Sequence, residues 1–207
     1  MAANVTDIPG RVTKALKEAD RFFMREGVVH QTLSEFTRKL DELRIPYAVV
    51  GGMALNAHGF ERFTVDVDIL VTRDSNRIIH EKLDGLGYVP PFAGSRNLRD
   101  TQTGTRIEFL ITGEYPGDGK PKPIAFPDPV GVSVEIEGVR YLRLETLIEL
   151  KLASGMTNPN RLKDISDIQE LIRVTRPPRE LAARLHEFVR TKYLELWDGL
   201  QSEPPEQ

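Results

Sequence analysis

The segment VDVDILV at positions 65–71 constrains the fold of this chain more than any other stretch. Its apolar residues alternate as in a buried β-strand, but Asp66 and Asp68 interrupt them. Residues two apart on a strand point to the same face, so the two carboxylates stand side by side, about 6–7 Å apart along the chain. Like charges this close repel unless a cation lies between them. The segment therefore predicts a strand that binds a positive group.

The composition predicts a globular chain with one domain and a helical extension. It has 207 residues, 40% of them hydrophobic and 29% charged, and no cysteine. The four histidines are too scattered for a zinc site, and the net charge of −3 leaves only a local basic patch for any nucleic acid. No run approaches the roughly 20 apolar residues of a membrane helix, and the N-terminus lacks a signal-like apolar core. We therefore expect a cytoplasmic protein without a membrane partner.

The order of the expected strands and helices indicates an α/β fold. We expect a small, mixed, twisted sheet with helices packed on one face and a C-terminal helical portion that closes the site. A Thr32–Glu35 capping box and a cap at Asp74 mark two helix starts. The proline- and glycine-rich stretch 112–131 cannot form regular helix or a central strand, and a loop of this length is often functional. Helices are expected at 11–26, 32–43, 53–58, 74–86, 144–154, 161–174 and 179–199, and strands at 47–50, 65–71, 106–111 and in a 132–142 hairpin.

The chemistry of the chain gathers around two glycines and three acids. Gly51 and Gly52 follow the first strand and open a helix, where backbone N–H groups can bind phosphate. Asp66 and Asp68 lie on the next strand, and Glu108 lies on a later one. Carboxylates on adjacent strands can hold Mg²⁺, which prefers oxygen ligands. A phosphate site beside such carboxylates predicts phosphoryl or nucleotidyl transfer, with magnesium as the positive group.

The segment VVGGMALNAHGFERFTVDVDILV resembles the signature of the polymerase-beta-like nucleotidyltransferase superfamily. That signature is a glycine pair, about a dozen residues, Asp-x-Asp, and a third acid on a later strand. The Arg-x-Thr-x-Asp-x-Asp form and the later stretch LIELKLASGMTNPNRLKDISDIQEL are most similar to AbiEii-type toxins and related small bacterial nucleotidyltransferases. The resemblance covers about positions 45–175. Glu108 departs from the aspartate that is usual in this family.

The resemblance implies a role for each matching residue. Asp66, Asp68 and Glu108 would bind two magnesium ions, and Glu108 would also take the proton of the attacking hydroxyl. The nucleoside triphosphate would be bound by Gly51, Gly52, Arg62, Thr64, Lys151 and Lys163. The acceptor would be RNA, a protein hydroxyl or a small molecule, and an antitoxin could be a partner. The implied parts are N-terminal helices at 1–44, a nucleotidyltransferase core at 45–142, a helical portion at 143–200 and a disordered tail at 201–207.

Several of these residues also have an ordinary structural interpretation. Asp66 and Asp68 could be surface carboxylates on an edge strand. Glu108 could be an ordinary exposed residue that pairs with Arg106 or another cation. Lys163 and Asp167 could form an i, i+4 salt bridge on a helix. Two other function classes stay open. One is a catalytically weak module that binds a nucleotide or a partner within a toxin–antitoxin pair. The other is modification of small molecules, as in antibiotic-adenylylating relatives.

Overall fold

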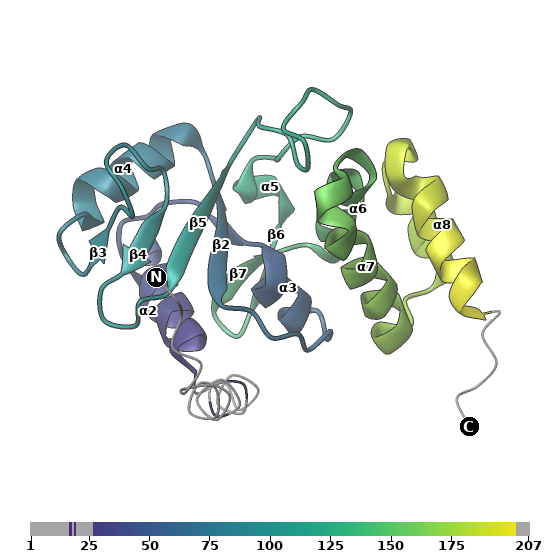
Figure 1. Ribbon diagram of the computed structural model, residues 1–207, viewed down its shortest axis with the longest axis horizontal. Helices are drawn as coiled ribbons and strands as arrows, with labels where there is room; N and C mark the ends of the chain where they lie inside the picture. The colour runs from purple at the N-terminus through teal and green to yellow at the C-terminus, as the bar shows by residue number, and fades with distance from the viewer. Residues whose placement is uncertain (1–16, 18, 20–26, 202–207) are drawn as a thin grey trace, which may run out of the picture.

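The computed structural model describes residues 17, 19 and 27–201, and its strands form one seven-stranded sheet (Figure 1). The strand order is β3-β4-β5-β2-β1-β7-β6. Strand β2 is parallel to β5 and antiparallel to β1, so the sheet is mixed, as the sequence predicts. The strands are β1 (Ala48–Val49), β2 (Asp66–Val71), β3 (Tyr88–Val89), β4 (Leu98–Asp100), β5 (Arg106–Ile111), β6 (Ser133–Ile136) and β7 (Val139–Leu142).

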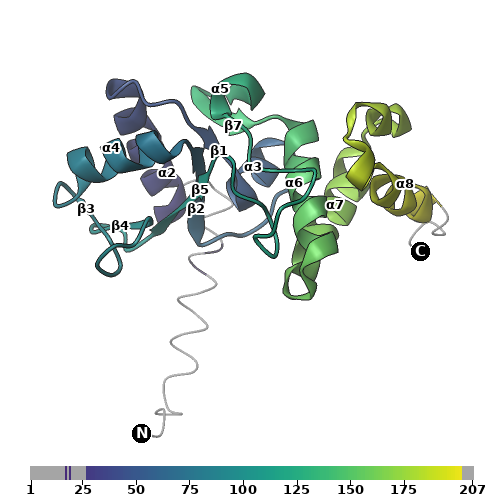
Figure 2. The same ribbon diagram turned by 90° about the horizontal axis from the view of Figure 1, so that it is seen from above.

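Most of the helices lie toward the two ends of the molecule. Figure 2 shows α2 and α4 at one end and α6, α7 and α8 side by side at the other. No helix within the described residues is long and apolar enough to cross a membrane. The α-helices are α2 (Val28–Glu42), α3 (Gly51–Ala57), α4 (Arg73–Leu83), α5 (Pro129–Val132), α6 (Leu144–Thr157), α7 (Leu162–Thr175) and α8 (Glu187–Gln201), with 3-10 turns η2 (Pro159–Arg161) and η3 (Arg179–Arg184).

The central strand β2 divides the core into two layers. Val67, Ile69 and Val71 pack into a cluster with buried residues of α2 and α4. Leu70 points the other way, into a cluster formed with α3, α6, α7 and α8. The expectation of helices on one face only was therefore wrong, because β2 is an interior strand that needs apolar cover on both faces. Asp66 and Asp68 share the second face with Leu70, at the end of the strand that this cluster does not cover.

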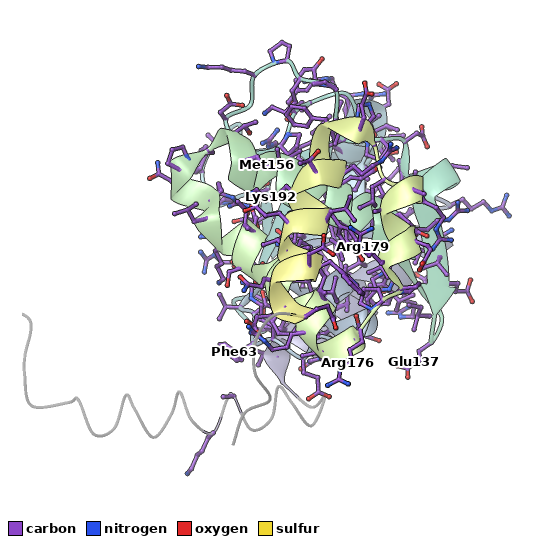
Figure 3. All side chains as sticks on the ribbon, turned by 90° about the vertical axis from the view of Figure 1, so that its right-hand side faces the viewer. Phe63, Glu137, Met156, Arg176, Arg179 and Lys192 are labelled. Atoms are coloured by element: carbon purple, nitrogen blue, oxygen red, sulfur yellow. The ribbon has the colours of Figure 1, made fainter. Side chains whose placement is uncertain are left out.

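The C-terminal helices pack on one another around Leu152, Ile168, Leu171 and Tyr193, all of them fully buried. Figure 3 looks at the molecule from this end, with α8 nearest to the viewer. The single helix expected at 179–199 is instead the 3-10 turn η3 followed by α8. The break is stabilised from outside the segment: the backbone N–H of His186 donates to Glu149 of α6 at 2.6 Å. That distant acceptor cannot be seen in the local pattern.

Both helix starts read from capping signals were wrong. Helix α2 begins four residues before Thr32, which lies buried inside it and donates to Asp100 Oδ2 at 2.9 Å. Helix α4 is capped by Thr72, whose hydroxyl oxygen accepts from Ser75 N at 3.1 Å, and not by Asp74. A polar residue near a helix start can bond to a tertiary partner in place of the backbone, and local spacing does not distinguish the two.

The remaining differences from the expected elements lie in the short strands and at the chain ends. Strands β3 and β4 were not predicted, because they are only two and three residues long and form through pairing at the sheet edge. The hairpin turn at Glu137 and Gly138 is confirmed: both residues have positive φ, of 52° and 78°. The helix expected at 11–26 and the tail beyond residue 201 fall almost entirely outside the described residues.

Candidate active site

A cleft of about 880 Å³ opens on the sheet face that carries Asp66 and Asp68. Its walls come from the start of α3, from β2 and β5, from α6 and α7, and from the loop between β5 and α5. All the residues predicted for the site line this one cleft, namely Gly51, Gly52, Arg62, Thr64, Asp66, Asp68, Glu108, Lys151 and Lys163. The fold thus brings together positions that span more than half of the chain.

The two glycines serve different geometric needs. Gly51 has φ of +58°, and a Cβ on it would lie 1.8 Å from Asp68 Oδ2. Gly52 has no positive φ, but a Cβ there would lie 2.8 Å from the Thr64 Cβ. Gly51 therefore provides the left-handed turn into α3 and the space for the Asp68 carboxylate. The close approach at Gly52 is to Thr64 of this chain.

Gly51→Ala is expected to destabilise the protein by about 1–2 kcal/mol, the usual cost of a left-handed L-residue, and also to turn Asp68 out of its position. Urea unfolding and nucleotide titration would measure the two effects. Gly138→Ala is the matched control, because Gly138 has φ of +78° but nothing within 4 Å of an added Cβ. If both variants bind nucleotide equally well, the contact between Gly51 and Asp68 has no part in binding.

The parallel register of β2 and β5 places three carboxylates and one arginine side by side. Asp68 is the partner of Glu108, and Asp66 is the partner of Arg106. The Arg106 guanidinium lies with its Nε 3.3 Å from Asp66 Oδ1 and donates from Nη2 to Glu108 Oε1. Pairing of Glu108 with Arg106, one of the alternatives read from the sequence, is therefore confirmed. In this structure the cation beside Asp66 is an arginine of the neighbouring strand.

Two carboxylates of this site, those of Asp66 and Asp68, have raised pKa values. Burial, with a further contribution from Glu108, raises the pKa of Asp68 to about 6. Burial also raises the pKa of Asp66, against the opposing charge of Arg106. No ion pair in the described part of the chain reaches Asp68, although Lys151 and Arg161 lower its pKa from a distance. A further cation that approached Asp68 would thus be strongly favoured.

The donor set suits a hard divalent cation, because carboxylate oxygens from two adjacent strands face one cleft. The missing Cβ of Gly51 also leaves room beside Asp68 Oδ2. Among the described residues, however, no group of three or more acids and histidines is already arranged to hold a metal. Asp68 could act as a ligand where it stands, whereas Asp66 and Glu108 would first have to leave Arg106.

The opposite wall of the cleft is a buried ion network. Lys151 Nζ donates to Asp164 Oδ1 and to Asp167 Oδ2, each at 2.8 Å. Arg62 Nη1 donates to the same Asp167 oxygen at 2.8 Å. The alternative pairing of Lys163 with Asp167 is not formed: Lys163 is exposed at the cleft, while Asp167 is bound by the other two cations. Lys151 and Arg62 would have to exchange partners to contact a phosphate, whereas Lys163 would not.

Sequence reasoning did not find this network. Ser154 Oγ and Arg161 Nε also donate to Asp164 Oδ2, at 2.7 and 2.9 Å. Burial would raise the pKa of Asp164, but Lys151 and these donors outweigh it and lower the pKa below its ordinary value. The signal was available in α7, where Asp164 and Asp167 fall on the same face as the buried Ile168 and Leu171. Two acids on a buried helix face require cations from elsewhere.

The loop at 112–128 arches from the end of β5 toward the start of α7 (Figure 1). Residues 113–119 line the cleft, and Gly117 O accepts from Asn158 Nδ2 at 3.1 Å. A Cβ on Gly117 would lie 2.7 Å from Ser154 O, so the loop packs directly on α6. Lys122 Nζ donates to Pro116 O and Asp118 Oδ1 within the loop, and these bonds stabilise the loop conformation.

Comparison with known proteins identifies the fold. No protein-family model and no curated protein sequence matches this chain. The solution structure of the antibiotic-resistance factor ANT(2'')-Ia matches it with a TM-score of 0.52 and 17% sequence identity, over 85% of this chain and 96% of that one. This chain therefore shares the fold of that protein. A nucleotidyltransferase-like protein from Paracoccidioides brasiliensis also matches, with a TM-score of 0.47 and 18% identity over 84% of this chain and 92% of that one.

The mixed seven-stranded sheet and the helices packed on it confirm the predicted α/β class. At 17% sequence identity the likeness to ANT(2'')-Ia is one of fold. In this fold the cleft is bounded by β2, β5 and the C-terminal helices, and all the residues that carry the sequence motif line it.

Proposed function

We propose that this chain is a magnesium-dependent nucleotidyltransferase. It moves a nucleoside monophosphate from a nucleoside triphosphate to an acceptor hydroxyl and releases pyrophosphate. One observation carries the proposal: Asp66, Asp68 and Glu108 stand on two adjacent parallel strands in the same cleft as Gly51, Gly52 and a wall of cations. Acids for a metal and cations for phosphate are the two requirements of the reaction.

The two walls of the cleft would bind different groups, the acids a metal and the cations the phosphates. Asp66 and Asp68 would hold the metal, which polarises the phosphate oxygens and lowers the pKa of the attacking hydroxyl. Lys163 is exposed at the cleft and could contact phosphate oxygens directly, whereas Arg62 and Lys151 are bound to carboxylates in the same cleft. Glu108, once free of Arg106, would accept the acceptor's proton. The acceptor itself is RNA, a protein hydroxyl or a small molecule.

The decisive experiment is incubation of the purified protein with each α-labelled nucleoside triphosphate, magnesium and a cell extract. Labelled RNA, protein and metabolites are then separated. We expect label in one acceptor class, dependent on magnesium and on an intact Asp66 and Asp68. Label with the same yield in the Asp66→Asn variant would contradict the proposal.

Glu108→Gln is expected to slow single-turnover transfer by about a hundredfold or more, within the usual 10²–10⁴-fold effect of losing a general base. Triphosphate affinity should stay within about tenfold, because Asp66, Asp68 and the cations remain. Glu108→Asp is the matched variant: it keeps the acid and should stay active. If Glu108→Gln transfers as fast as the parent, Glu108 is a bystander and its bond to Arg106 is structural.

The second candidate function is a nucleotide-binding module of low catalytic power within a toxin–antitoxin pair. The pairing of Glu108 with Arg106 favours it, because the carboxylate that would serve as the general base is bound to a guanidinium. The AbiEii-type likeness of the sequence motif supports the same setting. Nucleotide binding that depends on magnesium, without transfer to any acceptor class, would move this candidate ahead.

A further inference from the structure

Arg106 occupies an unusual place among the three acids. Its position on β5 is opposite Asp66, and Glu108 lies two residues further along the same strand face. The guanidinium bridges the two strands by contacting Asp66 at 3.3 Å and Glu108 at hydrogen-bonding distance. It is thus a cation within the acid cluster itself, separate from the cationic wall that Lys151 and Arg62 form on the opposite side of the cleft.

The neighbouring residues make this arrangement distinctive. Arg99 of β4 is the direct cross-strand partner of Arg106, so two arginines stand opposite one another on the same sheet face. Like charges in this position are ordinarily unfavourable. Arg99 donates to the carbonyl of Gly104, whereas Arg106 bonds to the acids. The two side chains are therefore alike in chemistry and strand position but differ in whether they contact the acids.

We propose that Arg106 is an internal cation that competes with the metal: it neutralises Asp66 and Glu108 in the metal-free protein and must turn away before the three acids can bind a divalent ion. This inference rests on the proposed function, since it requires the acids to be a metal site. It accounts for Asp66, Asp68 and Glu108 sharing one face without forming a preassembled three-ligand group.

The position of Arg106 allows this exchange. It is the first residue of β5, and 51% of its side chain is exposed. The guanidinium can therefore turn into solvent without leaving a buried, unpaired charge. A divalent ion carries twice the charge of the guanidinium and can bind carboxylate oxygens from several directions. The ion therefore replaces the arginine once the metal concentration is high enough. Arg106 thereby raises the metal concentration at which the site fills.

The test is a titration of Mn²⁺ into the metal-free protein without nucleotide. Binding is measured by calorimetry and by the paramagnetic signal of free Mn²⁺. Arg106→Gln should bind Mn²⁺ about tenfold more tightly than the parent, since one opposing charge at this distance is worth a unit or more of pKa to a carboxylate. Arg99→Gln, which removes the same charge from the same face, should stay within about threefold of the parent. Arg106→Lys, which keeps the charge but loses the planar fork, should fall between the parent and Arg106→Gln.

Each outcome bears on the inference. Equal tightening in Arg106→Gln and Arg99→Gln would reduce the effect to net charge and overturn it. Unchanged or weaker Mn²⁺ binding in Arg106→Gln, beside normal binding by the parent, would overturn it while leaving the proposed function in place. If neither the parent nor Arg106→Gln binds Mn²⁺, the metal site itself is wrong, and the proposed function falls with the inference.

Discussion

Asp68→Asn is expected to slow nucleotidyl transfer by about a thousandfold or more and, without metal, to make the protein more stable at about pH 7.5. The loss of transfer follows from the loss of a metal ligand, because metal polarisation contributes several kcal/mol to the barrier and each 1.36 kcal/mol is a factor of about ten. The gain in stability follows from removing a carboxylate whose ionisation the fold opposes, through burial and through Glu108.

The pH dependence of this gain has a definite sign. The pKa of Asp68 is about 6 in the folded protein, against an ordinary value of 3.8. Between these values the folded state holds more protons than the unfolded state, so the contribution of Asp68 to stability falls as pH rises. The parent and Asp68→Asn should unfold alike near pH 4, and above about pH 7 the variant should be more stable by about 1–3 kcal/mol.

Urea unfolding in a chelating buffer, over this pH range, would measure the difference. Asp198→Asn is the control, because hydrogen bonds from Arg179 lower the pKa of Asp198 and neutralising it should not stabilise the protein at neutral pH. Saturating magnesium should reverse the order of the parent and Asp68→Asn, since only the parent gains the ligand. A variant that is less stable than the parent without metal would contradict the electrostatic account of the site.

Lys151→Met is expected to lower the free energy of unfolding by about 3 kcal/mol. This is the lower end of the range observed when one partner of a buried ion pair is removed. Lys151 is buried and bonded to two buried carboxylates, Asp164 and Asp167. Both acids keep another cation, Arg161 and Arg62 respectively, which limits the loss. Adding Asp164→Asn to Lys151→Met should recover part of the lost stability, because the second change removes an uncompensated charge.

Chemical denaturation of the three proteins would measure these differences. Lys192→Met is a matched control: Lys192 pairs with the exposed Glu195 on α8, and its loss should change stability by about 0.5 kcal/mol or less. If Lys151→Met unfolds like the parent but loses triphosphate affinity, Lys151 acts on the ligand and the network is not structural. Loss of both stability and affinity would indicate that the network also positions Arg62 at the cleft.

Local pattern alone determined several parts of this protein. Alternation in VDVDILV fixed both the strand and the shared face of Asp66 and Asp68, because side-chain direction on a strand depends only on the period of two. The glycine pair located the turn from β1 into α3, although the sequence could not tell that Gly51 carries the positive φ. The Glu137–Gly138 hairpin was equally readable, because its strands are neighbours in sequence.

Only the tertiary structure decided which groups meet across the site. Glu108 lies beside Asp68, and Arg106 beside Asp66, because β2 and β5 pair in parallel in one register, and that register is set by packing on both faces of the sheet. Lys151 lies between Asp164 and Asp167 because α6 packs against α7. The sequence identifies which residues are acids and which are cations. Whether an acid binds a metal, an arginine or a lysine depends on contacts between segments that are distant in sequence, and no local pattern contains those contacts.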